Sequence, residues 1–375
     1  MRWLRNAEDK PMLNVLHYVS RMDRAGQETF LMNLFRKIDR EKIQFDFLCS
    51  EQAEGAYDPE IRALGGHVYH TEAVAARGPI KQFRKYAALK AALREHPCDV
   101  FHIHTHHAMD AFRDALAAKN SGVATVVVHS HNTGALYHVQ AHRVFRHLLA
   151  LLPIRRFACS EAAGRWMFTK NNFRVIHNGL DLDAIYFRPE RREEVRKAMG
   201  WEGQKIIGHV GRFNEQKNHR FLVAVFAEIH RKDPQTRLVL VGKGELEPEI
   251  RELVREKGLE DAVDFLGVRS DAQTLYQGMD LLLFPSLFEG LSVVLIEAQA
   301  CDLPCLISDT NSRETAVTDR LCPMSLNESP ERWAEEALRL LNEAPARTDN
   351  RADLRRAGYD IGALAADLER LYAEG

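Results

Sequence analysis

The chain has 375 residues, enough for two domains that each bury a core of their own. With 45% hydrophobic and 28% charged residues and a formal net charge of −2, its composition is that of a globular protein. No apolar run of 18 residues predicts a membrane span, and the N-terminus lacks the apolar core of a signal peptide. We therefore expect a cytoplasmic protein with no nucleic-acid partner and, from six scattered cysteines, reduced thiols.

The first half of the chain alternates apolar runs typical of strands with amphipathic runs typical of helices. The strand-like runs are 13–19, 45–49, 99–104, 124–129 and 155–160, and the helix-like runs are 28–38, 80–96 and 141–152. The second half repeats this alternation, with strand-like runs at 205–211, 236–242, 263–267, 280–286 and 303–309. Continuous apolar strands between helices predict parallel sheets covered on both faces. The fold class is therefore α/β, with two doubly wound, Rossmann-like domains.

The boundary between these domains is expected near 178–204, where an Asn-Gly turn signal, a proline and a charged run follow one another. This gives an N-terminal domain over 1–185 and a C-terminal domain over 186–354. The last segment, 355–375, reads as an amphipathic helix with no strand of its own to join. We expect it to cross back to the N-terminal domain.

Charged residues follow two strands of the second half, where open α/β sheets bind ligands. Arg212 and Lys217 come just after 205–211 and suit a diphosphate, although an exposed basic turn is the alternative. After 280–286, Glu289 precedes a helix expected to begin near Leu291 or Ser292, and Glu297 lies about two turns inside it. The free amides of Gly290, Leu291 and Ser292 would form an anion site there.

Two carboxylates beside such a helix end suit a ligand that carries hydroxyls on both sides of a diphosphate, as a nucleotide sugar does. For Glu289 the alternative is simple complementarity to the helix dipole. For Glu297 it is an ordinary surface position, which its apolar setting disfavours. The turn Gly242-Lys243-Gly244 lacks the third glycine of a dinucleotide fingerprint, so an NAD-dependent oxidoreductase is disfavoured.

Histidines mark the strand ends of the first half. His129 and His131 follow 124–128 and could orient a substrate or stabilise developing charge. His102 and His104 share one face of a strand, but no carboxylate or cysteine completes a ligand set, so a strand running into a substrate-lining loop is preferred to a metal site. We likewise interpret Asp181 and Asp183 as part of a turn rather than a metal-binding pair.

Taken together, these segments resemble a known family, the retaining, nucleotide-sugar-dependent glycosyltransferases of the GT-B fold, sequence family 4. The resemblance is narrower still to bacterial exopolysaccharide and capsule enzymes. The motifs that carry it span almost the whole chain: RMDRAGQETFLMNLFRKIDREKIQFDFL, HSHNT, VIHNGLDL, GHVGRFNEQKNH, LVLVGKGELEPEI, VDFLGVRSD and LFPSLFEGLSVVLIEAQACDLP. The resemblance implies two Rossmann-like domains that face an interdomain cleft.

The resemblance also implies roles for the donor-side residues. Glu289 would contact the donor sugar and Glu297 the ribose hydroxyls. The amides of Gly290 and Leu291, with Ser292 beside them, would hold the diphosphate together with Arg212 and Lys217. The loop around Val268 and Arg269 would meet the base.

In the first half, the family's active-site histidine maps best onto His131, with His129 in reserve. The family's glycine-rich loop, usually G-G-x-E, appears as Ala25-Gly26-Gln27-Glu28. Gly26 is kept and is expected near the donor phosphate, whereas Ala25 adds a methyl group in place of the first glycine.

The activity implied is sugar transfer, with retention, from a nucleotide sugar expected to be UDP-linked. The acceptor would be a glycan or a lipid-linked acceptor of cell-surface polysaccharide synthesis. Neither a metal ion nor another cofactor is expected, because cations and a helix end can neutralise the diphosphate. Two alternatives stay open: a nucleotide-sugar 2-epimerase on the same fold, and a non-catalytic module that binds a nucleotide sugar or lipid.

A membrane surface is a further candidate partner. Residues 1–185 hold 25 Lys and Arg against 19 Asp and Glu. Within them, 141–156 joins a leucine-rich face to Arg143, Arg146, Arg155 and Arg156, as in helices that lie on anionic leaflets. Packing of those leucines against the first sheet is the alternative. Docking would place the protein peripherally on the inner face of the cell membrane.

Overall fold

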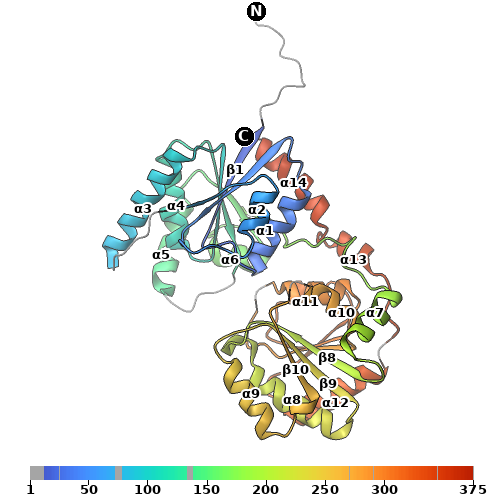
Figure 1. Ribbon diagram of the computed structural model, residues 1–375. Coiled ribbons are helices and arrows are strands. Elements are labelled where there is room, and N and C mark those ends of the chain that lie inside the picture. The colour runs from blue at the N-terminus through green and yellow to red at the C-terminus, as the bar shows by residue number, and fades with distance from the viewer. Residues whose placement is uncertain are drawn as a thin grey trace, which may run out of the picture. The chain divides into compact units, whose positions relative to one another are not determined.

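The computed structural model describes residues 12–24, 26–71, 78–132, 138–269, 271–289, 291–343 and 345–374. Residue contacts divide the chain into two compact units, and each has a sheet of its own (Figure 1). Unit 1 comprises residues 1–179 and 360–375, and unit 2 comprises residues 180–359. These divisions fall a few residues from the boundaries expected at 185/186 and 354/355.

In the described part of unit 1, seven strands form one parallel sheet in the order β3-β2-β1-β4-β5-β6-β7. They are β1 (Leu13–Val19), β2 (Ile43–Cys49), β3 (Val68–His70), β4 (Val100–Thr105), β5 (Thr125–Ser130), β6 (Arg155–Ala158) and β7 (Arg174–Val175). Every residue of β4 and β5 is buried, as expected for central strands covered on both faces. Their β-branched and aromatic residues suit that setting.

Helices cover both faces of this sheet (Figure 1). One layer holds α1 (Gly26–Lys37), α2 (Asp58–Ala63) and α14 (Ile361–Ala373). The other holds α3 (Gly78–Glu95), α4 (Ala108–Lys119), α5 (Val139–Leu149) and α6 (Glu161–Met167). The C-terminal helix α14 packs beside α1, and its Leu368 and Tyr372 lie in the same core cluster as Phe45. The end of the chain therefore completes a layer of unit 1.

Unit 2 contains a second parallel sheet, formed by six strands within the described residues in the order β10-β9-β8-β11-β12-β13. They are β8 (Lys205–Val210), β9 (Thr236–Val241), β10 (Val263–Gly267), β11 (Leu281–Phe284), β12 (Cys305–Ser308) and β13 (Leu321–Met324). The central β8, β9 and β11 are largely buried apolar runs, as predicted.

The helices of unit 2 again form two layers (Figure 1). One face carries α8 (His219–Lys232), α9 (Glu247–Glu256) and α12 (Pro330–Glu343), whose buried side chains join the core around Phe226, Ile250 and Trp333. The other carries α7 (Pro189–Met199), α10 (Ala272–Gly278) and α11 (Val293–Ala300), and α13 (Arg351–Arg356) follows later in the chain. Short 3-10 turns include η1 (Glu215–Lys217), directly after β8.

Asp181 and Asp183 lie where unit 2 begins, in a turn closed by amides that donate to the Asp181 carbonyl. The Asp183 carboxylate is 3.3 Å from Arg351 and 2.7 Å from Arg355. This arrangement supports the turn rather than a metal-binding pair. All six cysteines are described and are free thiols, and no described helix is long and apolar enough to cross a membrane.

Candidate active site

The two central strands of the unit 2 sheet mark the point where the strand order reverses. From β8 the chain moves outward to β9 and β10, and it then returns to form β11 on the other side of β8. Ligands bind at such switch points, beyond the carboxyl ends of the strands. The loop after β8 carries Arg212 and Lys217, and the loop after β11 carries Glu289. The topology thus brings two distant, charged segments to one edge.

Lys217 and Glu289 form an ion pair at this switch point. Their Nζ and Oε1 atoms are 2.6 Å apart, and the two side chains are only 13% and 9% exposed. The ammonium also lies 4.5 Å from the centroid of the Phe284 ring. A cation held in a partly dry setting attracts further anions more strongly than one in open water. The pair therefore places a cation and a hydrogen-bond-accepting carboxylate side by side.

Glycines shape the two loops around Lys217. A Cβ at Gly211 would stand 3.1 Å from the Lys217 side-chain carbons, so the lysine lies directly across this glycine. Gly242 has a φ of +136°, and a Cβ there would meet the Gly211 carbonyl at 2.0 Å. A Cβ at Gly244 would stand 2.3 Å from the Phe213 carbonyl. The Gly-Lys-Gly turn after β9 is thus a close-packed support for the loop that carries the lysine.

Side-chain amides join the loop after β8 to the loop after β11. The Gln216 side chain donates from Nε2 to the Phe288 carbonyl at 2.9 Å, and the Gln216 main-chain carbonyl accepts from the Leu287 amide at 2.8 Å. Asn218 donates to the Pro285 carbonyl at 3.2 Å. These bonds fix the backbone just before Glu289. The sequence offered no signal for them, because glutamine and asparagine in a polar loop are ordinary.

Arg212 was expected to grip a diphosphate together with Lys217, and in the structure the two cations pair with different carboxylates, Arg212 with Glu245 and Lys217 with Glu289. The Arg212 guanidinium is exposed and lies 3.2 Å from the Glu245 carboxylate, in the loop after β9. Exposed pairs of this kind contribute little to stability, so the arginine can leave Glu245 at small cost. Arg212 remains available to an anionic ligand.

The start of α11 lies close to its expected position. Ser292 is its N-cap residue, although the Ser292 side chain makes no capping hydrogen bond, and Leu291 is buried. Gly290 lies outside the described residues. The amides of the first turn of α11 therefore have no side-chain cap from Ser292, which is the condition under which a helix end can take an anion.

Glu297 lies in the second turn of α11 and is buried, with 8% of its surface exposed. Its two carboxylate oxygens accept hydrogen bonds from Gln273 Nε2 at 2.9 Å and from the Tyr276 hydroxyl at 3.1 Å. Burial raises the pKa of Glu297, and the two hydrogen bonds act in the opposite direction. A buried carboxylate with only neutral partners is a frequent mark of a functional site.

The loop expected to meet a base follows β10, at the edge of the same sheet. Val268 is exposed there, and Arg269 forms a double hydrogen bond of 2.7 Å with Asp271. The amide of Gly242 donates to the Gly267 carbonyl at 2.8 Å and ties this edge to the loop after β9. Val268 and Arg269 therefore lie on the edge occupied by Lys217 and Glu289, at the end of a more distant strand.

His131 follows β5 in unit 1, and it belongs to a row of histidines on one face of that sheet. His17 lies opposite His102 in the strand register, and His104 lies opposite His129. Burial lowers the pKa of His17 and His131 to about 3 and the pKa values of the other three well below the ordinary value. All five imidazoles are therefore neutral at pH 7.

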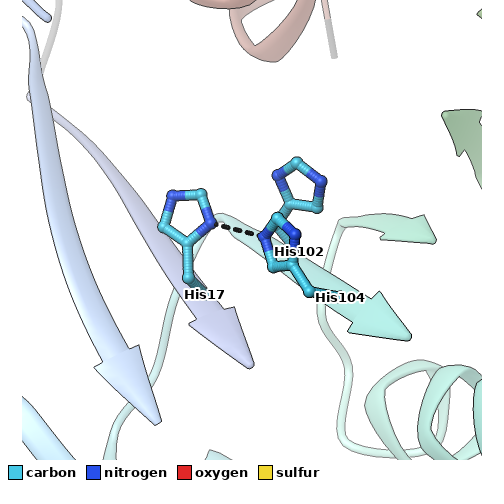
Figure 2. Close-up of side chains that lie close together, drawn as sticks. All are labelled: His17, His102 and His104. Carbon is cyan, nitrogen blue, oxygen red and sulfur yellow. Dashed lines mark hydrogen bonds between the residues drawn. The ribbon is translucent and has the colours of Figure 1, made fainter. Parts of the chain in front are cut away.

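The row is hydrogen-bonded along part of its length. His17 Nδ1 is 3.0 Å from His104 Nε2, and His104 Nδ1 is 2.9 Å from His131 Nε2 (Figure 2 shows the first of these bonds). His102 Nδ1 is bonded separately, to the Tyr372 hydroxyl at 2.6 Å. By distance alone, His17, His102 and His104, or His104 with His129 and His131, are close enough to share a metal ion.

The glycine-rich loop after β1 meets the first turn of α1. Gly26 is the first residue of α1 and is exposed, whereas Ala25 lies outside the described residues. Burial raises the pKa of Glu28, in the same turn, to about 7. Its carboxylate accepts from Gln27 Nε2 at 3.2 Å. The segment therefore holds an acidic group that titrates near neutral pH.

The sequence interpretation missed several residues that shape these sites. In unit 2 they are the hydrogen-bond partners of Glu297 and the glycine beneath Lys217; in unit 1 it is His17. His17 lies in an apolar strand with no other polar side chain on its face, so only the adjacency of β1 and β4 reveals its neighbours. Gln273 and Tyr276 lie on α10, and only the packing of α10 against α11 brings them to the carboxylate.

Comparison with known proteins identifies the family. Residues 24–184 match the family model described as glycosyltransferase family 4, and residues 204–343 match the one described as glycosyl transferases group 1. Glycosyltransferase EpsF of Bacillus subtilis is 37% identical over 368 residues, which cover 93% of this chain and 94% of EpsF. The capsular polysaccharide biosynthesis glycosyltransferase CapH of Staphylococcus aureus is 22% identical, covering 96% of this chain and 99% of CapH.

Solved structures show the same fold. The crystal structure of Anabaena HepE in complex with UDP matches with a TM-score of 0.77 at 18% identity, covering 97% of this chain and 100% of HepE. This likeness, with the two parallel Rossmann-like sheets, confirms the predicted GT-B fold class. The family match confirms the predicted enzyme class. The chain belongs to glycosyltransferase family 4 and is a glycosyltransferase.

Proposed function

We propose that the enzyme moves a sugar, with retention of anomeric configuration, from a UDP-linked donor to a glycan or lipid-linked acceptor in cell-surface polysaccharide synthesis. The observation that carries this is the Lys217–Glu289 pair at the β8/β11 switch point. HepE structures with UDP and with UDP-glucose support the donor class. The acceptor class is supported by CapH and by an Escherichia coli relative, 23% identical, named as a galactosyltransferase that acts on a GlcNAc-diphosphoundecaprenol.

We assign the donor to unit 2. Lys217, Arg212 and the first amides of α11 neutralise the diphosphate, and these groups stabilise the charge that grows on it as it leaves. Glu289, held against Lys217, accepts a hydrogen bond from the donor sugar. Glu297 accepts hydrogen bonds from the ribose hydroxyls, since each of its oxygens keeps a lone pair beyond the bonds from Gln273 and Tyr276.

The acceptor is assigned to unit 1, where His131 donates a hydrogen bond at the reacting sugar. In the reaction, the bond from the anomeric carbon to the diphosphate oxygen breaks and a bond to the acceptor oxygen forms on the same face. The acceptor proton passes to the departing diphosphate. No step requires a metal ion, because protein cations and helix amides carry the countercharge. A 2-epimerase would need acid and base groups for elimination, and the named relatives favour transfer.

The test is a transfer assay with the full chain. Purified protein is first screened against UDP-, GDP-, CMP- and dTDP-sugars by thermal shift, where a ligand at 100 times its Kd adds roughly 2.7 kcal/mol of stability. The stabilising donors are then incubated with lipid-diphosphate-linked sugar acceptors, and the product linkage is read by NMR. The proposal expects a new α-linkage from an α-linked donor. An epimerised donor, or donor binding with no transfer to any acceptor, contradicts it.

We further propose that unit 1 docks on the inner face of the cell membrane. Val144 on α5 and Leu151 just beyond it are 60% and 79% exposed, and Phe83 on α3 is 71% exposed. Both helices pack on α4, so these side chains belong to one helical layer. Exposed apolar groups on a basic layer fit an anionic lipid surface. Leu149, in contrast, is fully buried, so part of the leucine face does pack on the sheet.

The hydrogen bonds of the arginines indicate which of them are available to contact lipid. Arg146 donates to the Arg165 carbonyl at 2.7 Å, and Arg156 donates to the Leu152 carbonyl at 3.1 Å, so both also brace the local backbone. Arg143 is exposed on α5 and is the better probe.

Vesicle flotation tests the docking. We expect binding to vesicles containing anionic phosphatidylglycerol, but not to phosphatidylcholine, and release by salt. Arg143→Ala should weaken binding about fivefold, since each cation contributes about 1 kcal/mol, and Arg143→Glu should weaken it more because the substitution also adds a repelled anion. Phe83→Ser with Leu151→Ser should abolish it, whereas Met12→Ser, at another exposed apolar residue, should not. Absence of binding at low salt, or equal loss in the Met12 control, contradicts the proposal.

A further inference from the structure

Three imidazoles of unit 1 form a hydrogen-bonded chain that ends at the candidate active-site histidine. His17 Nδ1 meets His104 Nε2 at 3.0 Å, and His104 Nδ1 meets His131 Nε2 at 2.9 Å. Both nitrogens of the central ring are therefore used. Figure 2 shows the first link, from β1 to β4, with the His102 ring beside it but bonded elsewhere. At the far end, His131 Nδ1 has no partner among the described residues.

A neutral imidazole carries one N–H and one lone pair, so such a chain has a single direction. If His17 Nδ1 donates to His104, then His104 Nδ1 donates to His131, and the His131 proton must lie on Nδ1. In the reverse direction, His131 Nε2 donates to His104, whose Nε2 then donates to His17. The His17 proton then lies on Nε2. The tautomers of all three rings are thus coupled.

The surroundings of His17 favour the first direction. Its Nε2 is buried and has no hydrogen-bond partner in the described structure. The ring lies edge-on to Phe45 at a centroid distance of 4.3 Å and stacks on Phe47 at 5.5 Å. In either direction one end of the hydrogen-bonded series carries an N–H with no described partner, at His17 Nε2 or at His131 Nδ1. His17 is fully buried between these rings, whereas His131 follows the end of β5 and is partly exposed, so a ligand or water can accept from the N–H only at His131. The Nε2 of His17 therefore keeps the lone pair, and the proton lies on Nδ1, facing His104.

We infer that His17 and His104 are positioning residues that hold His131 in the Nδ1–H tautomer, so that His131 meets its ligand as a hydrogen-bond donor. The inference deepens the proposed function, on which the catalytic meaning of His131 rests. The ligand atom opposite Nδ1 must be an acceptor, such as a sugar hydroxyl oxygen or a phosphate oxygen. In this state both His131 nitrogens are occupied, Nε2 by the bond from His104, so His131 has no lone pair with which to act as a base.

The tautomers can be read directly, without any assay of transfer. In histidine-¹⁵N-labelled protein, long-range ¹H–¹⁵N spectra distinguish an Nδ1–H ring from an Nε2–H ring. We expect the Nδ1–H pattern for His17, His104 and His131 at pH 7.5, although neutral histidine in water favours Nε2–H. An Nε2–H pattern at His131 overturns the inference. This spectrum is informative even if the protein transfers no sugar, so the inference and the proposed function can fail separately.

Variants then link the tautomer to activity. His104→Phe and His17→Phe should lower kcat/KM for transfer about tenfold or more and shift His131 from the Nδ1–H pattern, while UDP affinity stays unchanged. His17→Asn should restore both, because its amide nitrogen can replace Nδ1 as the donor to His104. His102 is not part of the hydrogen-bonded series of imidazoles, so His102→Asn serves as the control for packing. Equal losses in His17→Asn and His17→Phe contradict the inference.

The alternative explanation of this histidine cluster is a bound metal ion. Mass spectrometry would show such a metal as one equivalent of zinc, nickel or copper in the purified protein, lost in His104→Phe. That result would make these imidazoles metal ligands and contradict the inferred hydrogen-bonded series. We expect no stoichiometric metal at this cluster.

Discussion

The two units share a topology but place opposite chemistry at their switch points. In unit 1 the strand order reverses between β1 and β4, and in unit 2 between β8 and β11. The first point carries neutral imidazoles, from His17, His102 and His104, whereas the second carries the Lys217–Glu289 ion pair. One fold thus supplies an uncharged hydrogen-bonding surface in one unit and a charged one in the other.

Burial explains why the two sites differ. The imidazoles point from central strands into a core that contains Phe45 and Phe157, so desolvation holds them neutral. Lys217 and Glu289 lie in loops beyond the strand ends, where each compensates the charge of the other. The charged pair therefore lies in loops beyond the strand ends, whereas the neutral imidazoles extend into the sheet.

The largest expected effect is on acid stability, and it should separate the two units. Burial lowers the pKa of His17 to about 3, so the unfolded chain binds protons below pH 6.5 that the folded chain does not. Stability contributed by neutral His17 is present above pH 6.5 and is lost as pH falls, by about 2 kcal/mol at pH 5. The other four buried histidines of the row act in the same sense.

Fewer buried groups of unit 1 have a pKa shift that favours the folded state as pH falls. Burial raises the pKa of Glu28 to about 7 and of Asp114 to about 6, so acidification relieves both, which offsets part of the histidine effect. In unit 2 the buried histidines are His209 and His219, and the raised pKa of Glu297 opposes them. Unit 1 should therefore unfold first as pH falls.

Calorimetry between pH 7.5 and pH 5 should show one transition moving to much lower temperature than the other. Hydrogen exchange of peptides from β8, β9 and β11 reports unit 2, and that of peptides from β1, β4 and β5 reports unit 1. Replacing His17 with Phe should reduce the pH dependence of the unit 1 transition. Equal shifts in both units would contradict the expectation that buried histidines make unit 1 the more acid-sensitive.

The second effect concerns the charged site. Glu289→Ala should lower the transfer rate by about 10²-fold, the loss typical for one preorganised electrostatic contact. UDP affinity should stay equal or rise, because Lys217 loses the carboxylate that competes with the diphosphate for its ammonium. Turnover is measured with saturating donor and UDP binding by calorimetry. Glu245→Ala, which removes the exposed partner of Arg212, is the matched control and should change turnover little.

Lys217→Ala completes this test, because it removes the cation and leaves Glu289 nearly buried and unpaired. Both UDP affinity and turnover should fall. If Glu289→Ala weakens UDP binding as strongly as Lys217→Ala does, the two residues act on the same group and the assigned division between sugar and diphosphate is wrong.

The third effect is smaller and falls on nucleotide affinity. Glu297→Ala should weaken UDP binding about tenfold, since one hydrogen bond to a charged group contributes about 1.5 kcal/mol. Tyr276→Phe removes one bond to Glu297 but keeps the carboxylate, so it should have a lesser effect. Calorimetric titration with UDP measures both. Unchanged affinity in Glu297→Ala refutes the ribose assignment, provided that its melting temperature shows an intact fold.

Long apolar strands were predictable from the sequence, whereas short ones were not. The expected strand at 13–19 and those ending near 104, 129 and 210 occur close to their predicted bounds. Three strands were missed: β3, β7 and β13. β7 has two residues and β13 contains Pro323, so neither has the length or composition that marks a strand.

For the site, the sequence could predict which residues follow strands but not which of them touch. Lys217 and Glu289 were both expected at the ligand edge, since parallel strands end together. Their direct contact depends on β11 returning beside β8, which no local pattern encodes. Arg212 and Lys217 were both expected to hold a diphosphate because both follow β8, and which carboxylate each one contacts, Glu245 or Glu289, was not predictable. Spacing along a loop does not fix side-chain direction.

The smallest expected effect is that of metal removal. Transfer should be unchanged by 5 mM EDTA, because Lys217, Arg212 and the amides of α11 provide the countercharge that Mg²⁺ supplies elsewhere. The D-x-D pair of the sequence, Asp181 and Asp183, is not poised to hold an ion, since Asp183 is already bonded to Arg351 and Arg355. Rates are compared with EDTA alone and with added Mg²⁺ or Mn²⁺. If chelation stops transfer and a divalent ion restores it, the charged site of unit 2 is incomplete without a metal. The contrast between a charged and a neutral switch point would then rest on that ion as well as on Lys217.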